Sequence, residues 1–258
     1  MQITQTENLR VDRDGGLLRL TITRPARMNA IDLASMTEIS DVFTESATDS
    51  SIGVVVLTGE GKAFCTGADL SAGSQTTPEV VMDAAGRMIR SVTTLPVPVI
   101  ARINGPAAGV GLSLALAADL IYAAESTYLL LPFVNIGLMP DGGATAVVAA
   151  AVGRVRAAAL SLLGERLPVA EAAAAGLITR ALPDDQLDAH VDAVAVKLAN
   201  GPRRALELTK AAVNAATLTE LDAALERETV GQIELLATPD FFEGAAAMLT
   251  RRTPSFGS

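Results

Sequence analysis

The segment most informative about the fold is Asn-Gly-Pro-Ala-Ala-Gly-Val-Gly-Leu-Ser, at residues 104–113. It follows the apolar run 97–103, which predicts a buried strand, and it opens an apolar helical stretch that reaches Asp119. A second segment of this kind, residues 61–70, reads Gly-Lys-Ala-Phe-Cys-Thr-Gly-Ala-Asp-Leu and follows the β-branched run 54–58. Such small-residue turns leave backbone N–H groups uncovered and let a ligand approach the chain closely.

Strands and helices alternate on both sides of these two turns. Apolar and polar residues alternate over 18–23, which predicts a half-buried strand. Asp32 is placed to cap the helix that should follow and run to Thr48. The run 120–124 predicts a further short strand. This alternation predicts an α/β fold for the first half of the chain.

Helices dominate after Gly143. The predicted helical segments are separated by breakers, namely Gly153, Gly164, Gly176, Gly201 and Pro239. We therefore expect an α/β core at residues 1–200 and a C-terminal helical region at residues 201–258.

The composition excludes several classes of protein. Of the 258 residues, 50% are hydrophobic and 19% charged, which excludes intrinsic disorder. A net charge of −9 and only 3% aromatic residues argue against a partner such as nucleic acid. The single Cys excludes an internal disulfide and fits a reducing compartment, so we expect a cytoplasmic protein. One His and one Cys cannot build a typical zinc site, so we expect no metal.

Two stretches are apolar enough to require a membrane test, residues 105–124 and 143–164. The first is interrupted by Pro106 and Asp119, and the second carries two arginines. Since charges at the centre of a spanning helix are costly, we expect buried elements of a globular core and no membrane span.

The two turns at 61–70 and 104–113 suggest a chemical role. Two N–H groups that converge on one oxygen form an oxyanion hole. From spacing alone, ordinary strand-to-helix turns are an equally good reading. The glycines of 104–113 do not match the dinucleotide fingerprint, and the chain has no phosphate-binding Gly-Lys-Ser/Thr loop. A third segment, residues 131–145, contains Pro-Asp-Gly-Gly, which is also an ordinary start for a helix capped by Asp141.

Taken together and in order, these segments resemble the crotonase superfamily, the enoyl-CoA hydratase/isomerase family. The resemblance covers nearly the whole chain. The matching segments are 24–30 (Arg-Pro-Ala-Arg-Met-Asn-Ala), 63–70, 98–105, 117–120, 136–140 and 251–256.

The resemblance implies a spiral of ββα units whose C-terminal helical region mediates a homo-trimer, commonly doubled to a hexamer. It implies an acyl-CoA thioester as substrate and no further cofactor, because coenzyme A is part of the substrate. By residue matching, the oxyanion-hole donors are the N–H groups of Ala68 and Val110. Further substrate-binding positions implied by the resemblance or placed beside it are Lys62, Ala63, Thr66, Gly67, Asp69, Leu70, Gly109, Ser113, Phe133 and Leu138.

The chain departs from the hydratases of that family at two positions. Ser113 and Phe133 stand where hydratases carry the glutamates that activate water. Neither side chain can serve as a general base at neutral pH. Asp141 matches a carboxylate used for acid–base or nucleophilic chemistry in other relatives.

We therefore predict a double-bond isomerase that uses Asp141, with its pKa raised by burial near Phe133 and Leu138. Three alternatives stay open: a non-catalytic acyl-CoA-binding protein, a weak enoyl-CoA hydratase, and hydrolase or dehalogenase chemistry with Asp141 as the nucleophile. A purely capping Asp141 is also open.

Overall fold

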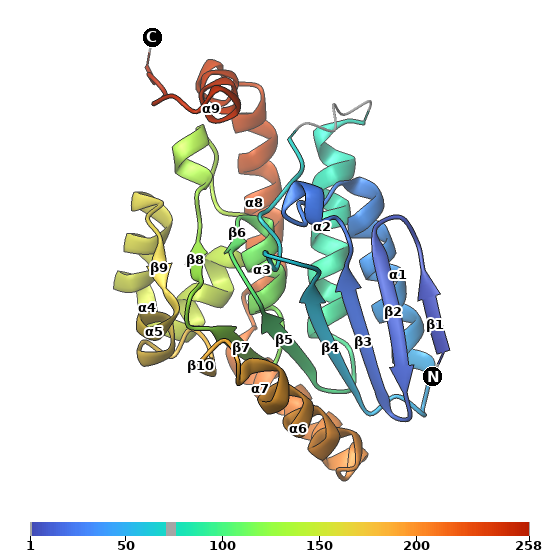
Figure 1. Cartoon of the computed structure of the whole chain (residues 1–258). Helices are drawn as coiled ribbons and strands as arrows, with labels where there is room; N and C mark the ends of the chain where they lie inside the picture. Colours follow the sequence, from blue (N-terminus) through green and yellow to red (C-terminus); the bar gives the residue numbers. More distant parts are fainter. Residues whose placement is uncertain (1, 71–75, 258) are drawn as a thin grey trace.

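A twisted seven-stranded sheet forms the centre of the computed structural model, which describes residues 2–70 and 76–257 (Figure 1). Its strand order is β1-β2-β3-β4-β5-β7-β10. Strand β2 pairs antiparallel with both β1 and β3, and the pairs from β3 to β10 are parallel. The bounds are β1 (Gln2–Gln5), β2 (Leu9–Asp14), β3 (Leu17–Ile22), β4 (Val54–Gly59), β5 (Val99–Ile103), β7 (Leu120–Ala124) and β10 (Arg180–Leu182).

The strands at 17–22, 54–59, 99–103 and 120–124 confirm the sequence predictions. All six residues of β4 are buried, because helices cover both faces of the sheet. Val55 and Leu57 join a core beneath α1 (Leu33–Thr48) and α2 (Pro78–Thr93). Val54 and Val56 point to the other face, into a smaller core under α6 (Leu187–Ala199).

A second, three-stranded sheet lies beside the first and is formed by short strands (Figure 1). Their bounds are β6 (Ala107–Ala108), β8 (Tyr128–Leu130) and β9 (Leu167–Pro168). The chain leaves β6 directly into α3 (Val110–Leu116), a buried helix that ends three residues before the predicted Asp119. The turn at 104–113 therefore lies where the two sheets meet.

The remaining helices follow or flank these sheets. Their bounds are η1 (Pro25–Arg27), η2 (Phe133–Ile136), α4 (Ala144–Leu163), α5 (Val169–Ala174), α7 (Arg203–Thr217), α8 (Leu221–Leu236) and α9 (Pro239–Thr250). Helix α8 packs against α2 and α4, and α9 packs against η2. The C-terminal helices therefore reach back over the third segment, residues 131–145.

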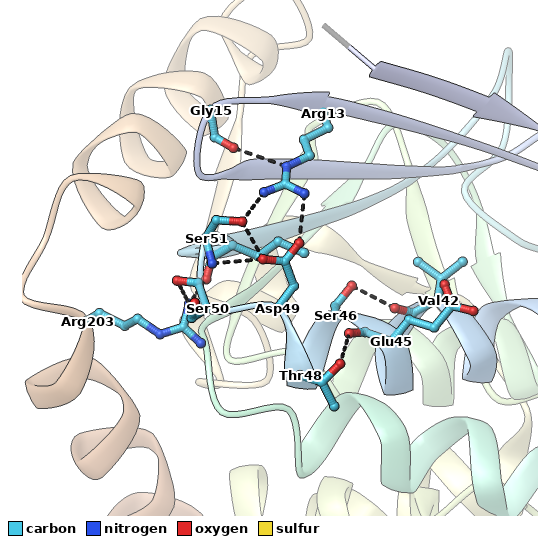
Figure 2. A network of polar contacts seen from close by, with 11 residues as sticks. Arg13, Gly15, Val42, Glu45, Ser46, Thr48, Asp49, Ser50, Ser51 and Arg203 are labelled. Atoms are coloured by element: carbon cyan, nitrogen blue, oxygen red, sulfur yellow. Dashed lines mark hydrogen bonds and ion pairs between the residues drawn. The ribbon is translucent and has the colours of Figure 1, made fainter.

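Two basic side chains of α7 fix the C-terminal helices to the core. Arg203 donates to the backbone carbonyls of Ser50 and Ile52, at the end of the loop before β4 (Figure 2). Lys210 is buried and forms an ion pair of 2.8 Å with Asp119. Buried pairs of this kind are costly to break, because one charge is then left without a partner.

Helix α4 is the one helix of the described residues that is long and apolar enough to cross a membrane, by length and composition alone. Its 20 residues are broken at Gly153, whose φ of 75° and ψ of 165° are not helical. Each half is therefore about half the ~20 residues that a spanning helix needs. Gly153, where the sequence predicts a break, therefore divides α4 into two consecutive helices. The expectation that residues 143–164 are buried in the core is wrong, because only Ala144, Val148 and Ala157 of α4 are buried.

Candidate active site

The two glycine-rich turns touch each other. The Ala108 N–H donates to the Cys65 carbonyl at 2.9 Å, and the Phe64 N–H donates to the Pro106 carbonyl at 3.2 Å. A Cβ atom added to Gly105 would lie 2.0 Å from the Lys62 carbonyl oxygen. The contact therefore requires glycine at this position.

Ala68 and Val110, the two predicted oxyanion-hole donors, lie on these touching turns. The Ile31 N–H donates to the Gly67 carbonyl, and the Asp69 N–H donates to the Ile31 carbonyl, both at 2.9 Å. In this parallel bridge the Ala68 N–H points away from Ile31. Val110 is the first residue of α3, where an N–H has no intrahelical acceptor. Within residues 2–70 and 76–257 neither amide donates a hydrogen bond to the protein.

Two asparagine side chains hold the first turn in place. Buried Asn29 donates to the carbonyls of Glu60, at 2.9 Å, and Ala63, at 2.7 Å. Asn104 donates to the Gly61 carbonyl at 2.9 Å and to the Ala63 carbonyl at 3.2 Å. The two asparagines come from the segments 24–30 and 98–105. These segments therefore act together on one turn.

The predicted substrate-binding residues of the first turn differ in exposure. Lys62 and Ala68 are exposed, Thr66 and Leu70 are half-buried, and Ala63 and Gly67 are buried. Asp69 is only 5% exposed at its side chain, where it pairs with Arg24 at 3.0 Å and with Arg27 at 3.3 Å. These ion pairs tie the turn to the segment at 24–30. The expectation that the turn contacts coenzyme A stays a prediction.

Three predicted pocket residues lie around the second turn. A Cβ added to Gly109 would lie 3.9 Å from Cζ of Phe133, and one added to Gly142 would lie 2.8 Å from Cβ of Ser113 and 3.4 Å from Cγ2 of Val110. Phe133 is buried. The fold therefore brings the third segment against the predicted donor Val110.

Leu138 is also buried, two residues beyond η2. Cys65 is fully buried between the turns, and burial raises the pKa of its thiol to about 12. A thiol with such a pKa is a packing group at neutral pH, because the thiolate is the nucleophile.

Asp141 carries a carboxylate whose two oxygens differ. Oδ2 accepts a hydrogen bond of 2.8 Å from Nε2 of Gln232, whereas Oδ1 is buried and has no partner among the described residues. The Asp141 backbone carbonyl accepts a bond of 2.7 Å from the Ser113 hydroxyl. Burial raises the pKa of Asp141 to about 7, the Gln232 bond opposes the rise, and the nearby Glu228 adds to it.

The capping alternative for Asp141 is wrong. Helix α4 begins after Gly143, and within the described residues the Asp141 side chain accepts no hydrogen bond from the first amides of this helix. Instead, Glu228 of α8 accepts from the Gly143 N–H at 2.7 Å and from the Thr145 N–H at 2.9 Å. It also accepts a bond of 2.6 Å from the Thr145 hydroxyl. The α4 N-terminus is thus capped by a side chain from another helix, and the Asp141 side chain has no capping role.

The sequence prediction missed Glu228 and Gln232, which come from a helix about 90 positions further along the chain. A signal was nevertheless present. The buried residues of α8 follow a helical stripe with spacings of three and four, and Glu228 and Gln232 fall on it: Leu221, Ala224, Leu225, Glu228 and Gln232. Polar residues on a buried stripe need partners, which is a reason to look for a site beneath them.

The described residues contain no group of three or more His, Cys, Asp and Glu side chains arranged to hold a metal ion. The candidate groups for chemistry at this place are the backbone N–H groups of Ala68 and Val110 and the carboxylate of Asp141. Such a set suits stabilising a negative oxygen while a proton moves.

The α/β fold thus brings two glycine-rich turns into contact beside the buried Asp141. Comparison with known proteins gives the family. The family model for enoyl-CoA hydratase/isomerase matches residues 12–258, so the chain belongs to that family, within the crotonase superfamily.

Some individual relatives are named as hydratases and others as isomerases. A probable enoyl-CoA hydratase of Rhodobacter capsulatus is 38% identical over 251 residues, which cover 96% of this chain and 97% of that protein. A 1,2-epoxyphenylacetyl-CoA isomerase of Escherichia coli is 34% identical over 248 residues, covering 93% and 95%. The crystal structure of an enoyl-CoA hydratase from Mycobacterium avium subsp. paratuberculosis superposes with a TM-score of 0.93 at 46% identity, covering 98% and 100%.

Proposed function

We propose that this enzyme of the enoyl-CoA hydratase/isomerase family is a double-bond isomerase for enoyl-CoA thioesters. The thioester oxygen accepts from the N–H groups of Ala68 and Val110. The Asp141 carboxylate removes a proton from C2 of a 3-enoyl-CoA, which leaves a dienolate, and returns that proton to C4 to give the 2-enoyl-CoA. No atom is gained or lost, so the reaction needs no water and no cofactor.

The observation that carries this proposal is the buried Oδ1 atom of Asp141, which has no hydrogen-bond partner within residues 2–70 and 76–257. An acid–base group works best when its pKa lies near the working pH, and the pKa of Asp141 is raised to about 7. Because Glu228 caps α4, the Asp141 carboxylate accepts no hydrogen bond from a backbone amide of the described residues, and such a bond would lower its pKa. The named isomerase among the relatives supports the same class of reaction.

The residues at the two hydratase positions do not favour hydration. Phe133 offers no proton-transfer group. The Ser113 hydroxyl donates its single proton to the Asp141 carbonyl, which leaves no donor at that position to orient water. We therefore rank isomerisation above hydration.

The pair of assays that tests this proposal follows two substrates with one purified protein. Appearance of the conjugated enoyl absorbance from a 3-enoyl-CoA reports isomerisation, and its loss from crotonyl-CoA reports hydration. We expect fast isomerisation that is lost in Asp141→Asn. Robust hydration with an unchanged rate in Asp141→Asn would contradict the proposal.

A non-catalytic acyl-CoA-binding protein is the outcome if calorimetry shows binding and neither assay shows turnover. A covalent acyl-enzyme trapped at Asp141 would instead point to hydrolase or dehalogenase chemistry. Both readings share the acyl-CoA ligand, which we propose is held by the turn 61–70.

We also propose that the chain works as a homo-trimer or hexamer in the cytoplasm. Several large apolar side chains are exposed on the single chain, as an assembly interface requires. They include Val155, Leu162, Leu163, Leu208, Val213, Val230, Phe242 and Leu249. Sedimentation velocity would measure the mass, and a monomer would contradict the assembly.

A further inference from the structure

Gln232 is the only hydrogen-bond partner of the Asp141 carboxylate among the described residues. Its own side chain is 2% exposed and comes from the C-terminal helix α8. A buried amide must satisfy both of its ends, so its orientation carries information.

The orientation of the Gln232 amide is fixed by its other end. Oε1 accepts a hydrogen bond of 3.2 Å from the Met139 N–H. Since a backbone N–H can only donate, the amide oxygen must face Met139 and the NH₂ group must face Asp141. Helix α8 approaches closely enough for this, because a Cβ on the preceding Gly231 would lie 2.3 Å from the Met139 sulfur.

We infer that Gln232 is a positioning residue for Asp141, holding Oδ2 so that Oδ1 is the oxygen that receives and returns the substrate proton. This inference rests on the proposed function of Asp141. The Ser113 hydroxyl fixes the Asp141 backbone from the opposite side, through the carbonyl oxygen. Backbone and carboxylate are thus held separately, and one carboxylate oxygen is left for substrate.

The groups around Asp141 include one other titratable side chain, Glu228, four residues before Gln232 on α8. Helix α3 presents the Ser113 hydroxyl, and η2 and the first turn of α4 carry no titratable residue. Gln232 donates to the charged form of Asp141, which favours ionisation, whereas Glu228 and burial oppose it. Removing the Gln232 donor should therefore make Asp141 harder to ionise.

The test is the pH profile of kcat/KM for a 3-enoyl-CoA in Gln232→Met, which keeps the length of the side chain and removes the donor. We expect the acid limb to move up by about 1 pH unit and kcat at pH 7 to fall by about fivefold, with KM nearly unchanged. Gln186→Met is the matched control, because Gln186 is exposed and its side chain forms no cap on α6. That variant should keep the wild-type profile.

Gln232→Glu keeps an acceptor for the Met139 N–H but adds a second carboxyl beside Asp141. Because two neighbouring carboxyls share a proton, the single titration step should split into one step at lower pH and one at higher pH. Melting temperatures of both variants separate this effect from loss of the fold. In Gln232→Met, a carbon-13 NMR titration of the Asp141 carboxyl should show the same upward shift as the acid limb, with or without turnover.

An acid limb and an Asp141 titration that stay at their wild-type positions in folded Gln232→Met would overturn the inference. If Asp141→Asn abolishes isomerisation in the same series, the proposed function survives that outcome. If Asp141→Asn retains full turnover, the proposed function fails, whatever the Gln232 variants do.

Discussion

Two aspartates stand just before helices in this chain, and they have opposite environments. Asp32 caps α1: its Oδ1 accepts from the Ser35 N–H at 2.9 Å, and its Oδ2 pairs with Arg24 at 2.9 Å. Burial opposes these bonds, but the net effect lowers the pKa of Asp32. Asp141 precedes α4, its Oδ1 atom has no hydrogen-bond partner in the described part of the chain, and burial raises its pKa to about 7.

The difference lies in which side chain accepts hydrogen bonds from the first amides of the helix. At α1 it is the side chain of the preceding residue, as is usual. At α4 the long side chain of Glu228 arrives from α8 and takes the amides of Gly143 and Thr145. An aspartate before a helix thus acts as the cap of α1, whereas at α4 Glu228 takes that role and Asp141 does not.

The largest expected effect is the difference in isomerase activity between variants of the two aspartates. Asp141→Asn should lower kcat/KM for 3-enoyl-CoA isomerisation by about 10²–10⁴-fold, the usual contribution of a general acid–base group. Asp32→Asn should change it by less than about threefold, because Asn is an equally good cap. Equal losses in the two variants would remove the contrast.

The next effect concerns the cap that Glu228 of α8 provides for α4. Glu228→Ala leaves two helix amides and the Thr145 hydroxyl without their acceptor, which should cost about 3 kcal/mol of unfolding free energy. Urea unfolding measures this loss. Glu226→Ala, at an exposed position of the same helix, should stay within about 0.5 kcal/mol of wild type. A loss in Glu228→Ala no larger than in that control would mean that α4 does not depend on Glu228.

A third effect follows from the raised pKa of Asp141. A carboxyl with a folded pKa of about 7 and an ordinary value of 3.8 binds its proton more tightly in the folded state. Its contribution to stability is complete below the ordinary value and is lost as the pH rises through about 7. Asp141→Asn lacks this loss, so its advantage over wild type should widen by about 2 kcal/mol between pH 5 and pH 8.

Urea unfolding at the two pH values checks this third prediction. Asp32→Asn supplies the comparison, because the lowered pKa of Asp32 titrates below this window. A constant difference between wild type and Asp141→Asn would show that Asp141 is ionised throughout.

The smallest effect is expected from removing the cap that Asp32 provides for α1. Asp32→Ala should cost about 1 kcal/mol, because the Ser35 N–H loses its acceptor. Thermal or urea unfolding at pH 7 measures it, with Asp32→Asn expected to retain most of the stability. No loss in Asp32→Ala would show that α1 begins without help from its cap.

The sequence was sufficient where the signal is local. The strand at 54–59 is a continuous β-branched run because both of its faces are covered, and Asp32 caps α1 through its own near neighbours. The break in α4 followed from Gly153. The prediction missed β2 (Leu9–Asp14), because only Leu9 and Val11 of its six residues are apolar and residues 12–14 are all charged, which makes the alternation too short.

The turns of the candidate site could be predicted from the sequence, but the side chains that contact Asp141 could not. Resemblance placed Ala68, Val110 and Asp141, and the structure brings their segments into contact. The role of the Asp141 carboxylate, however, depends on Glu228 and Gln232, which reach it only after α8 folds back over the third segment. No local pattern near Asp141 encodes that contact.

The most direct test of the contrast is one carbon-13 NMR titration of the aspartate carboxyls, assigned with Asp141→Asn and Asp32→Asn. We predict that Asp141 titrates near pH 7 and Asp32 below its ordinary value of 3.8. If both carboxyls titrate together below pH 4, Asp141 carries no proton at neutral pH, and the account of this site is wrong.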